Sequence, residues 1–598
     1  MAYRAPVDEI AFTLKSVAGI DDLLAEGLFP ELSADLVDAI LTEAGRFATD
    51  QIEPLNTVGD RYGTPIREGR VTMPPGWRGV YDQWVEGGWP ALTGPEAFGG
   101  QALPKALYAA IVEMWNQASP AFAIGPILTA GAIEAVESHA ADALKAKFLE
   151  PLVTGRWSGT MNLTEPQAGS DVGALRSRAE PAGDGTYRIF GQKIYITYVD
   201  HDLTENIIHL VLARLPDAPA GTRGISLFLV PKFMVGEDGS LGAENDVTCR
   251  AIEHKLGIHG SPTCTMGYGD RGEGAIGYLI GEENRGLACM FTMMNNARLA
   301  VGLQGVGVAE RALQQATSYA VERTQGRAPG ASGDGMSPII EHPDVKRMLL
   351  TMRGLTEAAR AIAYSCAIAI DRAETMQGDD ARSWQARADI LTPIAKAFST
   401  DIGVEVASLG VQVHGGMGYV EETGAAQFLR DARIFPIYEG TNGIQAIDLV
   451  MRKLPIADGA AFAAWIADLR ADAERVRAAN DPALAAVGAR LADAIADMEA
   501  AAAWLGTTRN EGRVADALAG ATPFLRLCGL TAGAVALARS ALLSAQDTAI
   551  AASPAGARRA LVARFFAANP LTATASLRRE IEAGGDVIAS ATSEMLTS

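Results

Sequence analysis

Four short segments decide the fold: TYRIFGQKIYIT (186–197), IIHLVLARL (207–215), GISLFLVPKF (224–233) and GAIGYLI (274–280). They are rich in β-branched and aromatic residues, and Gly, Asp and Pro turns separate them, a pattern that predicts β-strands. No long helical pattern interrupts them. We therefore expect an antiparallel β module, and not the alternating strands and helices of a doubly wound parallel sheet.

Helical patterns lie on both sides of this module. Apolar residues recur at spacings of three and four, which predicts amphipathic helices. The segments with this pattern are 32–52, 106–124, 289–326, 342–373, 392–416 and, in an Ala-rich tail, 460–479 and 484–506. This order predicts an α+β multidomain protein.

We expect four domains along the chain, which agrees with the number that its length suggests. They are an N-terminal helical domain (1–158), a middle β domain (159–284), a C-terminal helical bundle (285–455) and an additional C-terminal helical domain (456–598).

Composition and charge exclude several classes of protein. The 598 residues are 48% hydrophobic and 20% charged, which is enough apolar material for a large core and excludes a mostly disordered chain. Lys and Arg number 51 against 71 Asp and Glu, a net charge of −20. So acidic a protein is a poor partner for nucleic acid or for anionic lipid. Any anionic ligand must be held by a few local donors.

Cysteine usage and apolar runs indicate a cytoplasmic protein. The five cysteines lie far apart with no CxxC pair, as expected for reduced thiols. The first residues show no apolar signal segment. Apolar runs such as 529–538 are short for a bilayer span, so we expect no membrane association.

Several common site motifs are missing. The chain has no GxxxxGK[ST] phosphate loop and no GxSxG nucleophile turn. Gly305 and Gly307 lie inside a predicted helix, where a dinucleotide fingerprint does not occur. His254 and His259 are five residues apart with no third ligand nearby, so we expect no metal site.

The segment LTEPQAGSD (163–171) departs from ordinary structural sequence. Its Thr, Ser and Gly residues surround a proline turn and offer hydroxyl and backbone N–H donors at close range. Such donors suit the edge of a planar, electron-accepting ring. The alternative is a polar turn that only caps a strand.

The segment VQVHGGMGYVEETGAAQFLRDARIF (411–435) contains Gly415 and Gly416 at a predicted helix end. Two glycines there are typical of a C-cap. They also allow a ligand backbone or a pyrophosphate to approach closely. Both interpretations stay open from the residues alone.

The segment PIYEGTNGIQAIDLVMRKL (436–454) places Glu439 among Phe435, Pro436, Ile437 and Tyr438, just before a helix. The predicted N-cap of that helix is Thr441 or Asn442. A carboxylate at this place can simply stabilise the positive helix end. A Glu between bulky apolar residues is also what a tuned general base needs.

Together with KIYIT, NNARLAVGLQGVG and YAVERTQG, these motifs resemble the FAD-dependent acyl-CoA dehydrogenases in order and spacing, over residues 35–455. The segments YRAP, AFGGQALP, KLGIHGSPTC and EGTNGIQ and the extra C-terminal helices resemble a long subgroup of that family. The subgroup contains the 3-(methylthio)propionyl-CoA dehydrogenases of bacterial dimethylsulfoniopropionate breakdown. Other long-chain and aryl acyl-CoA enzymes share the enlarged architecture.

The resemblance implies α,β-dehydrogenation of an acyl-CoA thioester to the trans-2-enoyl-CoA, with FAD as cofactor. Glu439 matches the catalytic base, and burial beside aromatic residues and the acyl chain is expected to raise its pKa. Some relatives place the base elsewhere, at the position of Ala297, and an alanine cannot abstract a proton. By the same matching Ser170, Arg298 and Gly440 are expected to contact the substrate, although a surface salt bridge is an alternative for Arg298.

The resemblance also implies a set of FAD contacts. On one subunit these are Leu163, Thr164, Ser170, Tyr195 and Thr197, with Thr441 and Gly443 closing over the cofactor; from a neighbouring subunit they are Arg323, Gln325, Gln412 and Gly416. Many relatives have Trp where this chain has Tyr195. The shared site implies a homodimer. His414 lies in the same segment, either as a packed helix-end residue or as part of the site.

Other functions remain open from the sequence. The family's electron acceptor is an electron-transferring flavoprotein, but an acyl-CoA oxidase, in which oxygen takes the electrons, has the same motifs. A medium-chain, long-chain or aryl acyl-CoA is an alternative substrate. A non-catalytic acyl-CoA-binding protein is a further alternative, against which the presence of Glu439 argues.

Overall fold

The computed structural model describes residues 3–332 and 334–598, which form two compact units. The sheet unit comprises Arg46–Pro104 and Ala118–Ala300. The helical unit comprises Met1–Gly45, Lys105–Gln117 and Val301–Ser598. The α+β architecture is as predicted. The four-domain division is finer than these two units and stays a prediction.

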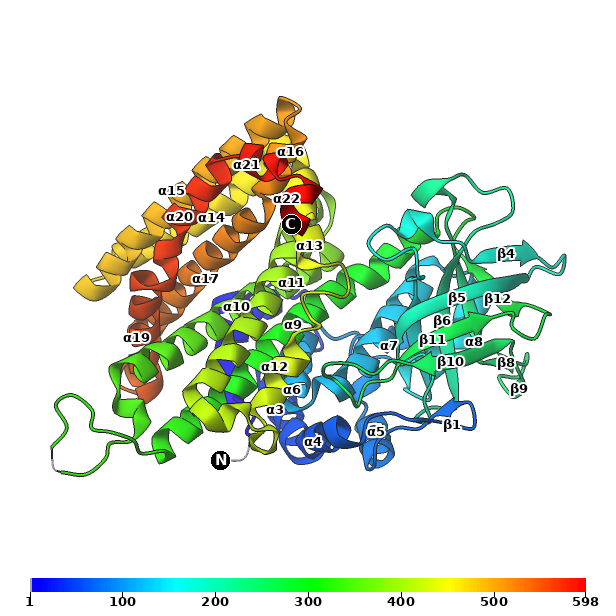
Figure 1. The fold of residues 1–598 in the computed structure, drawn as a ribbon, viewed down its shortest axis with the longest axis horizontal. Coiled ribbons are helices and arrows are strands. Elements are labelled where there is room, and N and C mark those ends of the chain that lie inside the picture. The colour runs from blue at the N-terminus through cyan, green and yellow to red at the C-terminus, as the bar shows by residue number, and fades with distance from the viewer. Residues whose placement is uncertain (1–2, 333) are drawn as a thin grey trace. The chain divides into compact units, whose positions relative to one another are not determined.

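The sheet unit is built on an eight-stranded sheet in the order β10-β11-β5-β12-β7-β6-β3, with β4 paired to β5 (Figure 1). Its strands are β3 (Trp157–Asn162), β4 (Arg178–Pro181), β5 (Tyr187–Thr197), β6 (Asn206–Ala213), β7 (Ser226–Pro231), β10 (Val247–Ile252), β11 (Thr263–Tyr268) and β12 (Ala275–Ile280). Two small pairs accompany it: β1 (Ile66–Arg67) with β2 (Arg70–Val71), and β8 (Phe233–Val235) with β9 (Leu241–Glu244). All four predicted strand segments are confirmed.

The pairing is antiparallel except at one edge of the sheet. There β3 runs parallel to β6, with Trp157 opposite Asn206. The chain leaves β3, forms β4 and β5, and returns to β6, so the two neighbours are not joined by a hairpin turn. Sequence patterns of single strands do not reveal such pairings.

Helices of the sheet unit are α4 (Glu53–Tyr62), α5 (Trp77–Glu86), α7 (Pro120–His139) and α8 (Asp142–Val153). Helix α7 lies close to β3, because a Cβ on Gly159 would be only 2.4 Å from the Ala132 Cβ. The predicted helix 106–124 is in fact two helices, α6 (Lys105–Ala118) and α7. The break comes at Ser119, which is extended, and Pro120 starts the new helix at a position that suits proline.

The helical unit begins with α1 (Val7–Phe12), α2 (Ile20–Ala25) and α3 (Ala34–Phe47). Its long helices are α9 (Gly286–Glu322), which starts in the sheet unit, α10 (Pro343–Thr375) and α11 (Gly378–His414), followed by α12 (Ala425–Ala432) and α13 (Asn442–Asp448). The additional C-terminal helices are α14 (Ala460–Arg477), α15 (Pro482–Asn510), α16 (Val514–Ala519), α17 (Ala521–Gln546), α18 (Thr548–Ala551), α19 (Pro554–Ala568), α20 (Thr574–Glu582), α21 (Asp586–Ser590) and α22 (Ser593–Thr597).

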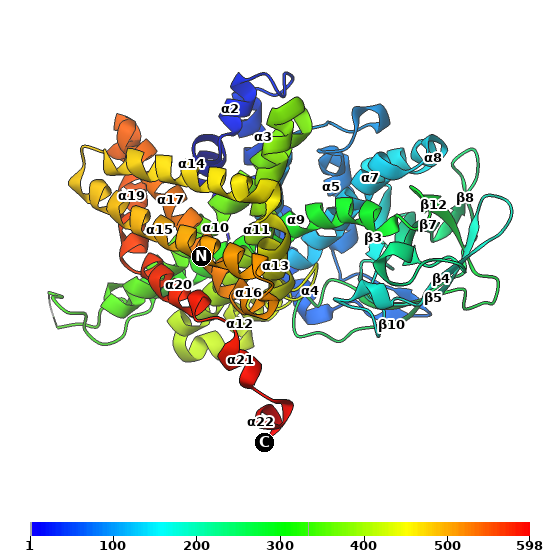
Figure 2. The same ribbon diagram turned by 90° about the horizontal axis from the view of Figure 1, so that it is seen from above.

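The additional helices pack on α10 and α11 through α17 (Figures 1 and 2). Two glycines allow the close approach. A Cβ on Gly529 would lie 2.3 Å from the Phe398 ring of α11, and one on Gly533 would lie 2.6 Å from the Ala358 Cβ of α10. The C-terminal domain is therefore closely packed against the preceding helices. Figure 2 shows α21 and α22 extending beyond it.

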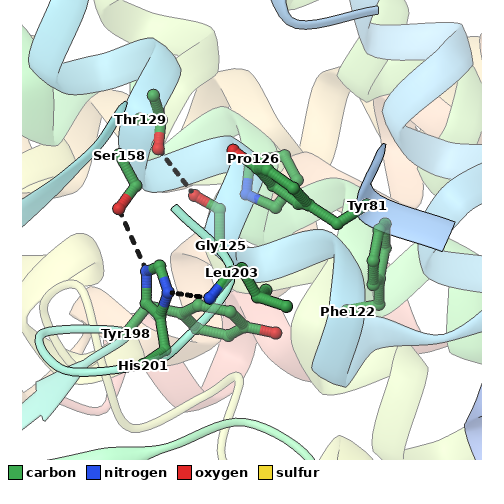
Figure 3. A pocket seen from close by; sticks show the side chains of 9 residues that line it. All are labelled: Tyr81, Phe122, Gly125, Pro126, Thr129, Ser158, Tyr198, His201 and Leu203. Atoms are coloured by element: carbon green, nitrogen blue, oxygen red, sulfur yellow. Dashed lines mark hydrogen bonds between the residues drawn. The ribbon is translucent and has the colours of Figure 1, made fainter. Parts of the chain in front are cut away.

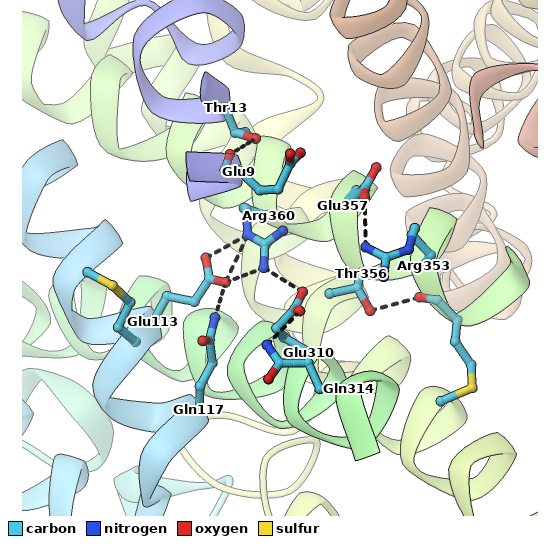
Figure 4. Close-up of polar contacts among 12 residues, drawn as sticks. Glu9, Thr13, Glu113, Gln117, Glu310, Gln314, Arg353, Thr356, Glu357 and Arg360 are labelled. Atoms are coloured by element: carbon cyan, nitrogen blue, oxygen red, sulfur yellow. Dashed lines mark hydrogen bonds and ion pairs between the residues drawn. The ribbon is translucent and has the colours of Figure 1, made fainter. Parts of the chain in front are cut away.

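A buried ion cluster joins helices α6, α9 and α10 of the helical unit (Figure 4). The Arg360 guanidinium contacts Glu113 at 2.6 Å and Glu310 at 2.9 Å, and all three side chains are at most 5% exposed. Glu9 of α1 forms ion pairs with Arg558 and Arg559 of α19. Breaking a buried pair leaves an uncompensated charge, so this cluster strongly favours one arrangement of the helices.

Two described helices, α7 and α17, have the length and apolar composition of a bilayer-crossing segment. The run 529–538 is thus part of a longer helix than its own length suggests. However, 78% and 72% of the apolar windows of α7 and α17 are buried within the structure. Burial of this extent is what core helices show.

Candidate active site

The loop between α12 and α13 carries the motif PIYEGTNG. The Asn442 backbone N–H donates to the Pro436 carbonyl at 3.0 Å and closes the loop. Thr441 is the N-cap of α13, because its Oγ1 accepts the Ile444 N–H at 3.3 Å. This contact decides between the two predicted caps. The Thr441 hydroxyl keeps its own proton for donation, so its expected contact with the cofactor stays a prediction.

The backbone at Glu439 and Gly440 is left-handed, with φ values of +55° and +85°. Gly440 adopts this conformation without strain, and a Cβ there would lie 2.7 Å from the Gln445 Nε2, so the position favours glycine. Glu439 has no such freedom, and a positive φ is unfavourable for it. Non-glycine residues with this strain cluster at functional sites when their surroundings hold them in place.

Glu439 is half-buried, in the apolar setting that was predicted. The Phe435 ring is fully buried and stacks with the Tyr438 ring at a centroid distance of 6.2 Å. The Tyr438 hydroxyl donates to the Gln304 Oε1. Burial raises the pKa of Tyr438, and the Glu439 carboxylate raises it further. The phenol therefore stays neutral beside the candidate base.

A fully buried lysine of α11 lies next to this loop. Lys396 Nζ donates to the Gly440 carbonyl at 2.9 Å and to the Asn442 Oδ1 at 2.8 Å. The ammonium group thus ties the loop to the middle of α11.

In the sheet unit, the turn 163–171 lies beside β5. The Ile194 N–H donates to the Thr164 carbonyl at 2.9 Å, and Lys193 Nζ donates to the Leu163 carbonyl at 2.9 Å. These bonds bring the predicted contacts Leu163 and Thr164 next to Tyr195.

Two further predicted residues lie at the end of β5. Tyr195 has a left-handed backbone, with φ +60°, and its side chain is 61% exposed. Thr197 is half-buried and pairs with Thr263 of β11. Ser170 is exposed on the turn. The Tyr195 ring is thus accessible, while Thr164 and Thr197 on the adjoining backbone are partly covered.

A buried ion pair holds the turn in place. Glu165 and Lys193 are 2.8 Å apart and almost fully buried, and the carboxylate also accepts the N–H groups of Arg176 and Ser177 at 2.7 and 3.0 Å. Burial alone raises the pKa of Glu165, but the Lys193 charge and the N–H donors outweigh it and hold the pKa at about 2. Burial lowers the pKa of Lys193 to about 8, against the opposing effect of Glu165.

Arg298 is buried in the part of α9 that belongs to the sheet unit, with 6% of its surface exposed. Its Nη1 donates to Asn295 Oδ1 at 3.3 Å, and its guanidinium lies 6.0 Å from the Phe291 ring centroid. The alternative of a surface salt bridge is wrong, because the side chain is not on the surface. Its predicted role towards the substrate stays a prediction.

The ends of α9 and α11 meet in the helical unit, where the Tyr319 and His414 rings stack at 4.5 Å. The four residues expected to reach a neighbouring subunit's FAD follow or flank these two positions. All of them are exposed: Arg323, Gln325, Gln412 and Gly416. The structure therefore brings them to one region of the helical unit.

His414 has a structural role. Its ring is 5% exposed, its Nδ1 lies 2.7 Å from the Gly410 carbonyl, and burial lowers its pKa. Of the two alternatives for His414, these contacts agree with a residue packed at the end of a helix. Gly415 ends α11 as a C-cap, with φ +59°.

A small cavity in the sheet unit lies between α7 and the segment that follows β5 (Figure 3). The Leu203 N–H donates to His201 Nδ1 at 3.2 Å, so His201 Nε2 donates to Ser158 Oγ at 3.0 Å. Burial lowers the pKa of His201 to about 3 and keeps the ring neutral. The cavity volume of about 10 Å³ suffices for a water molecule and not for a substrate.

The histidine pair that was considered as a metal site stacks ring on ring. The His254 and His259 centroids are 6.2 Å apart, and His259 contacts the carbonyls of Asp60 and Lys255. In the described part of the chain, no group of three or more His, Cys, Asp or Glu residues has the arrangement of a metal site.

Comparison with protein-family models matches most of the chain. The matches are to the acyl-CoA dehydrogenase N-terminal domain (37–156), middle domain (160–270) and C-terminal domain (284–454), and to the acetyl-CoA dehydrogenase C-terminal-like domain (461–592). The chain is 48% identical to 3-methylmercaptopropionyl-CoA dehydrogenase of Ruegeria pomeroyi over 92% of both chains. The chain belongs to the acyl-CoA dehydrogenase family.

A second relative and a solved structure are also similar to this chain. Identity to a butyryl-CoA dehydrogenase of Syntrophomonas wolfei is 37% over 78% of each chain. Among solved structures, Caenorhabditis elegans ACDH-11 in complex with C11-CoA superposes with a TM-score of 0.78, 20% identity and coverage of 95% of this chain and 92% of that one. This last similarity concerns the fold, the additional C-terminal helices included.

For this acyl-CoA dehydrogenase family member, motif matching did not identify the residues that hold the two loops. Lys396, Asn442 and Gln304 contact the Glu439 loop, and Glu165 with Lys193 holds the turn 163–171. One signal was visible: Lys396 is a lone charge in the apolar run TPIAKAF. A lysine there is buried only if it is paired.

Proposed function

We propose that this chain is an FAD-dependent acyl-CoA dehydrogenase that converts 3-(methylthio)propionyl-CoA to 3-(methylthio)acryloyl-CoA in dimethylsulfoniopropionate breakdown. The observation that carries this proposal is the 48% identity, over 92% of both chains, to the Ruegeria pomeroyi 3-methylmercaptopropionyl-CoA dehydrogenase. The half-buried carboxylate of Glu439 in the family's motif supports it.

In this proposal Glu439 removes the proton from carbon 2 of the thioester. A free Glu is a weak base for so weak an acid, so the apolar setting of Phe435 and the neutral Tyr438 matters. The Glu439 backbone N–H donates to the thioester oxygen and stabilises the charge that develops there. FAD, when bound, accepts the hydride equivalent that leaves carbon 3.

The residues of the sheet unit fit a flavin. Tyr195 is exposed, and Thr164 and Thr197 are half-buried. In this proposal the Tyr195 ring contacts the flavin through its apolar face, and the two threonines donate from their hydroxyl groups to its edge. Leu163 and Ser170 complete the proposed contacts of the sheet unit. The family resemblance also assigns cofactor contacts to Thr441 and Gly443. We assign substrate contacts to Ser170, Arg298 and Gly440.

We further propose a cytoplasmic homodimer that passes electrons to an electron-transferring flavoprotein. The exposure of Arg323, Gln325, Gln412 and Gly416 at adjoining helix ends supports a site completed by a second copy. The four-domain division of the chain is likewise proposed, and the boundaries of the family matches support it.

The test is anaerobic reduction of the purified flavoprotein by a panel of acyl-CoAs. We expect 3-(methylthio)propionyl-CoA to bleach the flavin with a higher kcat/KM than butyryl-CoA or a long-chain acyl-CoA. If another acyl-CoA bleached the flavin equally well or better, the substrate assignment would be wrong. A colourless protein that does not bind FAD would contradict the proposal that the chain is a dehydrogenase. Reoxidation by electron-transferring flavoprotein, and not by air, separates the dehydrogenase from the oxidase.

A further inference from the structure

We propose that Lys396 is a positioning residue that holds the Glu439 loop in its strained, active geometry. The proposal rests on Glu439 as the base of the proposed function. Neither Lys396 nor its partner Asn442 touches the reacting atoms in this account; both act through the backbone of residues 439–442.

The loop that carries Glu439 is strained. Glu439 and Gly440 both have positive φ, and this conformation costs free energy at Glu439 because that residue lacks the freedom of glycine. A strained loop relaxes unless its neighbours hold it. The hydrogen bonds from Gln445 Nε2 to the Glu439 and Gly440 carbonyls are long, at 3.4 Å each, and hold it only weakly.

Helix α11 makes a stronger contact with the loop. Lys396 is fully buried, and its ammonium donates to the Gly440 carbonyl at 2.9 Å, one residue from Glu439. It also donates to the Asn442 Oδ1 at 2.8 Å, two residues further along the loop. Hydrogen bonds from a charged donor are shorter and stronger than neutral ones. The ammonium therefore fixes the loop at two points directly after Glu439.

Asn442 is itself anchored to α11. Its Nδ2 donates to Asp401 Oδ1 at 2.7 Å, and it lies within hydrogen-bond distance of the Ala397 carbonyl and of Thr400 Oγ1, at 3.1 and 3.0 Å. The loop thus makes contact with one and a half turns of a single helix. A rigid element that supports the loop in this way gives a more defined position than the loop could keep alone.

Helix α11 is itself held in place where these contacts are made. A Cβ on Gly302 of α9 would lie 2.5 Å from the Ala395 carbonyl, and one on Gly305 would lie 2.3 Å from the Ser399 carbonyl. The backbones of α9 and α11 therefore touch on both sides of Lys396. The lysine cannot follow a relaxing loop by a shift of its helix.

The free energy of the buried ammonium depends on the shape of the loop. A buried ammonium is unfavourable unless hydrogen bonds compensate it, and two of those bonds exist only when the loop has this shape. The lysine and the loop conformation are therefore coupled. Without the ammonium, the Gly440 carbonyl loses its charged donor and the loop is free to relieve the strain at Glu439. A displacement of about 1 Å of a catalytic group can cost about 100-fold in rate.

The experiment compares the full-length holoenzyme carrying Lys396→Met with wild type and with Ser399→Ala. Ser399 is the matched control, because its buried Oγ on the same helix has no hydrogen-bond partner among the described residues. We expect Lys396→Met to keep bound FAD and the affinity for the enoyl-CoA product, while the rate constant of flavin reduction at saturating acyl-CoA falls about 100-fold. Ser399→Ala should reduce its flavin at the wild-type rate.

Asn442→Ala is the second variant. It tests the inference in place of Lys396→Met if that protein does not fold. It is expected to slow flavin reduction with product affinity kept, and the double variant should be no slower than the slower single one, since both remove the same support. Wild-type rates in Lys396→Met, or in Asn442→Ala when the first is insoluble, would overturn the inference. Loss of product affinity in step with the rate would also overturn it, because positioning of the base predicts a selective loss of rate. A wild-type protein that no acyl-CoA reduces contradicts the proposed function instead.

Discussion

The turn 163–171 and the loop 436–443 are each held by a fully buried lysine, but in different ways. In the sheet unit, Lys193 forms an ion pair with Glu165, a residue of the turn itself. In the helical unit, Lys396 donates to a peptide carbonyl and an amide oxygen, and the Asp401 carboxylate accepts a hydrogen bond from Asn442. Among 163–171 no residue has a positive φ, whereas Glu439 and Gly440 both do.

The difference separates two uses of a buried charge. The Glu165–Lys193 pair holds an unstrained turn, so its removal should mainly lower stability. The Lys396 contacts hold a strained loop, so their removal should mainly lower the rate. The following predictions test this contrast.

The largest effect on stability is expected from Lys193→Met. This change leaves the Glu165 carboxylate buried without its cation, and breaking a buried pair costs about 3–5 kcal/mol of the free energy of unfolding. Urea-induced unfolding measures it. Lys147→Met is the control, because Lys147 is 19% exposed and 3.7 Å from Glu237, where about 0–1 kcal/mol is expected. Equal losses in the two variants would contradict the contrast.

A slightly smaller loss of stability is expected when acid protonates Glu165. Glu165 has an ordinary pKa of 4.5 and is held at about 2 in the folded chain. Because the folded pKa is the lower one, the ionised carboxylate stabilises the fold fully above about pH 4.5, and this contribution disappears as the pH falls to about 2. The shift corresponds to about 3 kcal/mol.

Unfolding of wild type and of Glu165→Gln along a pH series isolates this contribution. The difference between their free energies of unfolding should shrink as the pH falls through that window. A difference that stays constant from neutral to acidic pH would show that the ionisation of Glu165 does not hold the turn.

The smallest effect on stability is expected from Gly440→Ala. A side chain at φ +85° costs about 1–2 kcal/mol, and the new Cβ would press on Gln445 Nε2. Gly443→Ala is the structural control, since its Cβ would have Thr441 Oγ1 as nearest neighbour at 3.9 Å. Thermal unfolding should separate the two variants. If Gly440→Ala were as stable as wild type, the loop would not need its left-handed backbone.

Much of the architecture was predictable because it depends on local patterns. The apolar period of three and four predicted α9, α10 and α11, and the β-branched segments predicted β5, β6, β7 and β12. Long-range pairing was not visible in this way. The parallel neighbour of β3 is β6, and the two strands are separated by more than forty residues of intervening chain.

The candidate site was predictable only in part, for the same reason. Motif matching selected Glu439 and placed it before a helix, and the structure has it there. It could not show that Lys396, which is 43 residues earlier, supports the loop, because a contact between distant residues leaves no local pattern. The predicted helix 106–124 breaks at Ser119, which has an extended backbone. The apolar periodicity continues across this residue, so it gives no sign of the break.

The central claim is that Glu439 is the base that starts the oxidation of the acyl-CoA. The most direct measurement is anaerobic stopped-flow reduction of the flavin by the best acyl-CoA, in wild type and in Glu439→Gln. The account predicts that the variant keeps its FAD and binds the acyl-CoA but does not bleach. Bleaching of Glu439→Gln at the wild-type rate would contradict it.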